Sequence, residues 1–147
     1  MKLYTFSYDK LKYSRKGKIA TLTDTINITL YTDQGEIKLD IRPGFRWNGN
    51  SGAFPCRFST DNEKYNVAIF THDVLYHRIG LSKADADDCL RGMLREAGYG
   101  RFMAGLIHKA VTIFGRCAYD EDDEMTLSNL QYINISLPNN KNQNDIK

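Results

Sequence analysis

The segment "TINITLYTDQGEIKLDI", residues 25–41, contains two runs in which apolar and polar residues alternate. The apolar positions follow a period of two: Ile26, Ile28 and Leu30, and then Ile37, Leu39 and Ile41. Because successive side chains of a β-strand point to opposite faces, this period predicts two strands, each with one buried face. The link "TDQG", residues 32–35, predicts that the two strands form a hairpin.

Two earlier segments extend this pattern. The runs "LYTFSY" (3–8) and "KIATL" (18–22) are further candidate strands, so we expect a small antiparallel sheet with one buried face. The next segment, "RPGFRWNGNSGAFP" (42–55), is rich in Pro and Gly and therefore predicts a loop. Binding and catalytic groups are often found on such loops.

From about residue 61 the period becomes helical. One stripe contains Tyr65, Ile69, His72 and Tyr76, and a second contains Val67, Phe70 and Val74. Apolar residues on two stripes predict a helix that is mostly buried. A second helix is expected after Gly80, with Ser82 as N-cap, Asp85 three residues later and Gly98 as its C-terminal stop.

The remaining sequence contains a third helical segment and a polar end. Residues 100–119 have enough apolar side chains for another core helix, whereas residues 121–147 are acidic and then polar. The sequence therefore predicts an α+β protein, with an N-terminal antiparallel sheet followed by about three helices. We expect one domain over residues 1–120 and a flexible, disordered tail over residues 121–147.

The composition narrows the class of protein. The chain has 147 residues, of which 41% are hydrophobic and 26% charged, and this is typical of one soluble domain. The net charge is only +2 and the Lys and Arg residues are dispersed, so nucleic-acid binding is not expected. Neither a signal peptide nor a transmembrane segment is predicted. The three Cys residues are far apart, which favours reduced thiols.

Asp87 is the unusual acidic residue of the second helix, because it lies at the edge of the apolar side whereas Asp85 and Asp88 project away from it. A carboxylate near a core needs a donor, and the stripe with His72 and Tyr76 offers one. We therefore expect a pair between His72 and Asp87. In such a pair Asp87 fixes the imidazole tautomer, and the other ring nitrogen can take a proton from water, as in a His/Asp hydrolytic dyad.

Each of these residues also has a structural interpretation. A buried His bonded to a carboxylate and a Tyr can serve only to join two helices. Asp73 shares a polar stripe with Asn66 and His77, so it lies either on a solvated helix face or in a calcium site completed by loop oxygen atoms. Simpler roles are sufficient for the other polar residues: a helix cap for Asp85, an exposed pair with Arg91 for Asp88, helix packing or a surface position for His108, and a buried thiol for Cys89. A catalytic metal centre is not favoured, because no His precedes His72.

At these residues the sequence resembles a small family of unknown function that is found mainly in phages and prophages. The matching features are Gly44 and Phe45, the loop "NGNSGAFP" (48–55), the "HDVLY" run (72–76), and Ala86 with Asp87. The similarity covers roughly residues 37–119. One departure is Asn48, where the family pattern is expected to carry Asp.

The same two helices distantly resemble the bacterial and fungal type of secretory phospholipase A2. That resemblance implies that His72 is the general base, Asp87 its orienting partner and Tyr76 a second donor to Asp87. It also implies a calcium site formed by Asp73 and the loop residues Asn48, Gly49 and Asn50.

Two functions follow as expectations. The first is a phage or prophage accessory protein with a His/Asp hydrolase site that acts on an ester. The calcium site implied by the resemblance makes dependence on calcium part of this expectation. The second is a non-enzymatic phage protein, either a virion component or a binder of a host factor, in which the same residues join the helices. Either protein is expected in the cytoplasm of a bacterial host or in the virion.

Overall fold

A computed structural model describes residues 1–48, 62–120 and 123–138 of the chain. Its first sheet has four antiparallel strands in the order β1 (Leu3–Tyr8), β4 (Ile26–Thr32), β5 (Gly35–Ile41) and β7 (Ile133–Ser136). The second sheet has the order β2 (Tyr13–Lys16), β3 (Ile19–Leu22) and β6 (Arg46–Asn48). The helices are α1 (Glu63–Leu75), α2 (Lys83–Glu96), α3 (Arg101–Phe114), α4 (Arg116–Tyr119) and α5 (Glu124–Asn129), followed by the 3-10 turn η1 (Leu130–Tyr132).

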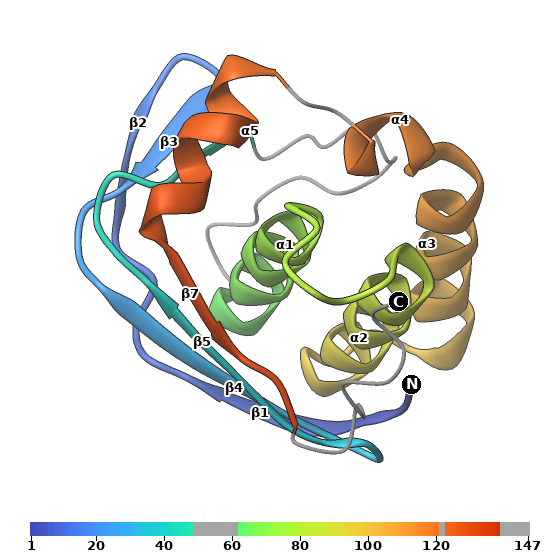
Figure 1. Ribbon diagram of the computed structural model, residues 1–147. Coiled ribbons are helices and arrows are strands. Elements are labelled where there is room, and N and C mark those ends of the chain that lie inside the picture. Colours follow the sequence, from blue (N-terminus) through green and yellow to red (C-terminus); the bar gives the residue numbers. More distant parts are fainter. Residues whose placement is uncertain (49–61, 121–122, 139–147) are drawn as a thin grey trace, which may run out of the picture.

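The predicted hairpin is confirmed. Strands β4 and β5 pair from Ile26 opposite Ile41 to Thr32 opposite Gly35. The alternating Ile and Leu side chains of both strands are at most 1% exposed, and their polar neighbours lie on the other face. The sheet therefore has one buried face, which is the face that the helices cover (Figure 1).

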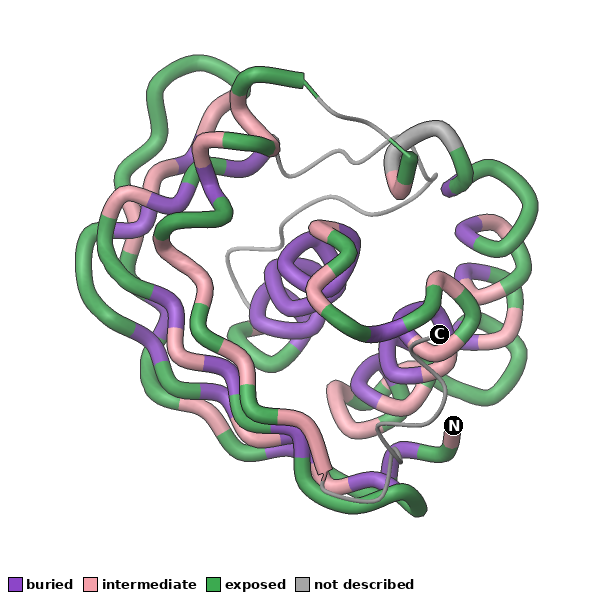
Figure 2. The backbone as a smooth tube through the Cα atoms, in the orientation of Figure 1, coloured by how far each residue is buried: buried purple, intermediate pink, exposed green. Residues whose placement is uncertain are grey.

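Helix α1 lies between the sheets and the helices α2 and α3 (Figure 1). Every residue from Tyr65 to Leu75 is buried, so this helix is enclosed on all sides (Figure 2). Helix α2 packs against α1 and β1, and α3 packs against the far side of α2. The cap of α2 is as expected, because the Ser82 hydroxyl accepts a hydrogen bond from the Asp85 amide and Gly98 follows the helix with φ of +96°.

Several features differ from the sequence prediction. The strands form two sheets instead of one. Strand β6 lies inside the segment predicted to be a loop, where the buried Phe45 and Trp47 flank the exposed Arg46 in the alternation that is typical of a strand. Helix α3 buries only Ala104, Ile107 and Val111, so it is a partly exposed helix and not a core helix. The α+β class is confirmed, but there are more helices than the expected three.

The C-terminal region also differs from the prediction of a flexible tail. Helix α5, η1 and β7 lie within residues 124–136, and β7 pairs with β5 from Ile41 opposite Ile133 to Lys38 opposite Ser136. Strand β7 is only four residues long and half-exposed, so its sequence has too few alternating apolar positions to indicate a strand. The rest of the predicted tail, residues 139–147, lies outside the described residues.

Candidate functional site

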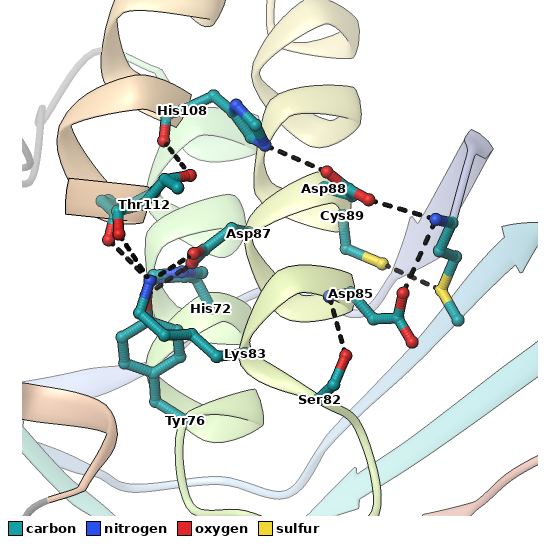
Figure 3. Close-up of polar contacts among 12 residues, drawn as sticks. His72, Tyr76, Ser82, Lys83, Asp85, Asp87, Asp88, Cys89, His108 and Thr112 are labelled. Atoms are coloured by element: carbon teal, nitrogen blue, oxygen red, sulfur yellow. Dashed lines mark hydrogen bonds and ion pairs between the residues drawn. The ribbon is translucent and has the colours of Figure 1, made fainter. Parts of the chain in front are cut away.

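His72 and Tyr76 are one helical turn apart on α1 and its C-cap, and their side chains point toward α2 (Figure 3). The two rings are in contact, with 4.1 Å between their centroids. His72 is 3% exposed and Tyr76 is 5% exposed. The pattern His-x-x-x-Tyr therefore presents two polar groups on the same side of a buried helix.

Asp87 of α2 meets both groups (Figure 3), as the sequence predicts for His72. Its Oδ1 atom lies 2.8 Å from His72 Nε2 and 2.5 Å from the Tyr76 hydroxyl, which donates to it. The carboxylate is 1% exposed. A buried carboxylate requires such donors, because an unsatisfied acceptor in a protein interior is costly.

Lys83 is the member of the cluster that the sequence analysis missed. Its Nζ atom lies 2.7 Å from Asp87 Oδ2, and it also donates to the carbonyl oxygens of Val111 at 2.8 Å and Thr112 at 3.3 Å. Lys83 precedes Asp87 by four residues, and this spacing is a signal for an ion pair on a helix. The contacts with α3 have no such local signal, because they join residues far apart in the sequence.

Gly115 provides the space for this arrangement. A Cβ atom at this position would lie 2.5 Å from the Tyr76 hydroxyl oxygen and 2.4 Å from the Val111 carbonyl oxygen. Gly115 has an ordinary φ of −79°, so close approach and not backbone conformation explains the glycine. The cluster of His72, Tyr76, Lys83 and Asp87, here called the Asp87 cluster, thus joins α1, α2 and the C-terminal end of α3.

The charges within the Asp87 cluster follow from burial and hydrogen bonding. Burial lowers the pKa of His72 below its usual value, and the bond to Asp87 opposes this only in part. Burial would raise the pKa of Asp87, but the hydrogen bonds from His72, Lys83 and Tyr76 together outweigh it and lower the pKa. These directions give a neutral imidazole beside an ionised carboxylate.

This protonation pattern fixes the tautomer of His72. An ionised Asp87 can only accept, so Nε2 of the neutral ring carries the proton and donates it to Oδ1. The other ring nitrogen, Nδ1, is then an unprotonated acceptor, and no group among the described residues forms a hydrogen bond with it. Chemically, Nδ1 is the atom at which this cluster can accept a proton.

Only some residues of the calcium site implied by the resemblance lie within the described part of the chain. Asp73 is buried at 7% exposure and not on a solvated face, and its backbone oxygen accepts a bond from His77 Nδ1 at 2.7 Å. Gly49 and Asn50 lie outside the described residues, and Asn48 is described only by its backbone pairing with Ile19 in β6. Within the described ranges no group of three metal-ligating side chains occurs. Calcium takes 6–8 oxygen ligands, and of the implied set only Asp73 has a described side chain.

The other polar residues of α2 and α3 have structural contacts. Asp88 lies 3.0 Å from His108 Nε2 (Figure 3). It also lies 3.1 Å from the Met1 amine, so its described partners differ from the Arg91 that the sequence suggests. Cys89 is fully buried as expected, and burial raises the pKa of its thiol to about 12. A thiol with this pKa is almost entirely protonated at neutral pH, which suits a packing role.

A groove of about 450 Å³ lies elsewhere, on the polar face of the larger sheet. Its lining includes Thr29, Lys38, Asp40 and Asn134 and no member of the Asp87 cluster. The groove and the cluster are therefore separate features.

Comparison with known proteins gives no match: no family model, no curated protein and no solved structure is similar to this chain at a significant level. Among the described helices, none is both long enough and apolar enough to cross a membrane.

Proposed function

We propose that this chain is a phage or prophage accessory protein in which His72 and Asp87 act as a hydrolytic dyad on an ester. The proposal is supported by one observation: Asp87 holds His72 through Nε2 at 2.8 Å, which leaves Nδ1 as a basic acceptor. Tyr76 and Lys83 hold the carboxylate in place with two further hydrogen bonds. An orienting carboxylate of this kind is the usual partner of a catalytic imidazole.

In the proposed reaction Nδ1 of His72 removes a proton from water, and the water oxygen attacks the ester carbonyl carbon. The ionised Asp87 stabilises the imidazolium that forms. The carbon–oxygen bond to the leaving alcohol then breaks, and the imidazolium returns its proton to the leaving oxygen. The products are an acid and an alcohol, and the histidine is neutral again.

A second function is favoured by the burial of the same residues. His72 is only 3% exposed, and Lys83 extends the Asp87 cluster to two carbonyl groups of α3. Both observations suit a cluster that joins three helices in a non-enzymatic phage protein, either a virion component or a binder of a host factor. The two functions differ in whether His72 must accept a proton or only donate a hydrogen bond.

The deciding experiment is an ester hydrolysis assay on wild type, His72→Gln and the matched control His108→Gln. His108 is the other histidine that bonds a carboxylate of α2, so its substitution controls for the loss of a ring in the helix layer. Short-chain activated esters and phospholipid vesicles serve as substrates, each with excess calcium or with a chelator. Thermal melting of each variant separates lost fold from lost activity.

The dyad predicts turnover by wild type and by His108→Gln and its loss in folded His72→Gln, because an amide cannot accept the proton. The variant Asp73→Asn is assayed in the same way. A loss of its turnover that excess calcium partly restores would support the calcium site as well. Turnover that survives in His72→Gln would exclude the dyad. Wild type without turnover on any of these esters would favour the non-enzymatic function.

A further inference from the structure

Helix α3 presents a second apolar face that no described part of the chain covers. The side that packs on α2 contains Ala104, Ile107 and Val111. Large apolar side chains are exposed along the rest of the helix: Phe102 at 81%, Met103 at 40%, Leu106 at 48%, Ile113 at 57% and Phe114 at 68%. Figure 1 places α3 on the outside of the molecule, with α2 between it and α1.

Three of these side chains, Phe102, Leu106 and Ile113, share one stripe of α3. An aromatic side chain offers roughly 150–250 Å², so Phe102 at 81% exposure alone leaves well over 100 Å² uncovered. The aliphatic side chains add to this area. Single exposed apolar residues are common, but several that share one face of a helix are typical of an interaction site.

The charges on α3 are all of one sign. Its charged side chains are those of Arg101 and Lys109, and it contains no Asp or Glu. Lys109 lies on the same helical stripe as Phe102, Leu106 and Ile113, and not on the opposite side of α3. Long cationic side chains can lay their methylene groups on apolar surface while the charge remains at its edge.

This combination selects the kind of partner. A second copy of the chain would bring cations against cations, because α3 offers no acidic group to pair with them. A bilayer of anionic phospholipids has negative headgroups above apolar acyl chains, so it complements both the cations and the exposed apolar side chains of α3. We propose that the outer face of α3 docks on an anionic phospholipid bilayer, with its axis along the surface and the Phe102, Leu106 and Ile113 side chains entering the acyl layer.

The proposal concerns binding and does not depend on catalysis by His72. It is tested by co-sedimentation of the full chain with vesicles of phosphatidylglycerol and with vesicles of phosphatidylcholine. We expect binding to the anionic vesicles, weaker binding to the neutral ones, and a decrease with added salt. Phe102→Ser should lower partitioning roughly tenfold, and Lys109→Gln should lower it roughly fivefold.

Two exposed residues on other elements provide matched controls. Tyr4→Ser removes an aromatic ring that is 58% exposed on β1, and Lys38→Gln removes a cation that is 65% exposed on β5. Both variants should bind vesicles as wild type does. The proposal is overturned if wild type does not bind anionic vesicles, or if Phe102→Ser binds them as well as wild type does. A concentration-dependent dimer that Phe102→Ser abolishes, without vesicle binding, would overturn it in favour of a second copy.

Discussion

Asp87 is buried and receives hydrogen bonds from three side chains, those of His72, Tyr76 and Lys83. Its neighbour Asp88 has a side chain that is 37% exposed and can exchange protein partners for water. The two residues are adjacent in the sequence and have opposite environments. They therefore form a natural pair for comparison.

We expect Asp87→Ala to lower the free energy of unfolding by about 1–3 kcal/mol, because it leaves buried donors without an acceptor. Asp88→Ala should cost much less, since water can hydrate the groups that Asp88 contacts. Denaturant unfolding of both variants checks this prediction. Equal and small losses would show that the Asp87 cluster contributes little to stability.

The pKa of His72 predicts how stability depends on pH. Burial holds this pKa below its usual value of 6.5, and the pKa of His77 is lowered in the same way. As pH falls below about 6.5 the unfolded chain binds protons that the folded chain does not, so stability present above this pH is lost. The denaturation midpoint should therefore decrease as the pH is lowered from about 7 to about 5. His72→Gln should flatten the profile in part, leaving the slope due to His77, whereas an unchanged slope would contradict the assignment.

At the scale of elements, the C-terminal end of α3 is held by contacts with residues of α2 and of the C-cap of α1. Lys83 donates to the Val111 and Thr112 carbonyls, where a cation also interacts favourably with the helix dipole. Gly115 lets the Tyr76 hydroxyl approach the same end of the helix. This junction can be tested with two glycines of the same region.

Gly115→Ala should be destabilising, because the added Cβ meets the Tyr76 hydroxyl oxygen at 2.5 Å and the Val111 carbonyl oxygen at 2.4 Å. The control is Gly105→Ala inside α3, where the nearest atom would be Arg91 Nη2 at 3.9 Å. There Ala should stabilise the helix by up to about 1 kcal/mol. Melting temperatures that shift in opposite directions are expected, and a shift of the same sign would refute the close packing at Gly115.

The elements that could be predicted from the sequence are those with a strong local pattern. The hairpin of Ile26 to Ile41 and the enclosed α1 follow from periodicity, and the Ser82 cap follows from short-range chemistry. The contact of His72 with Asp87 could be predicted because a buried acid needs a buried donor. The contacts of Lys83 with α3, the β7 strand and the split into two sheets depend on residues far apart in the chain, so no local pattern contains them.

At the scale of the whole molecule, the segment 132–138 covers three glycine turns. Tyr132 lies over Gly44, Leu137 over Gly80 and Pro138 over Gly35, and an added Cβ would lie 2.7–2.8 Å from each of these side chains. All three glycines have positive φ values, between 110° and 114°. The C-terminal segment is thus fitted to backbone turns from three other parts of the fold.

Gly44→Ala tests this fit. The control is Gly98→Ala, which has a similar φ of +96° but no atom within 4 Å of the added Cβ. Both variants suffer backbone strain, and only Gly44→Ala also displaces Tyr132, so it should be more destabilising by about 1 kcal/mol or more. The double variant Gly44→Ala with Tyr132→Ala should recover part of this excess. Equal losses in the two single variants would argue against a tight contact.

The pairing of β7 with β5 also has a consequence for synthesis on the ribosome. Residues 35–41 emerge early, but their partners at 133–136 are translated about a hundred residues later. Throughout that interval the nascent chain carries an open sheet edge, and such an edge can pair with other extended chains. Slow translation or a premature stop before residue 133 should therefore favour aggregation of incomplete chains, and a chaperone that covers extended segments would act during this interval.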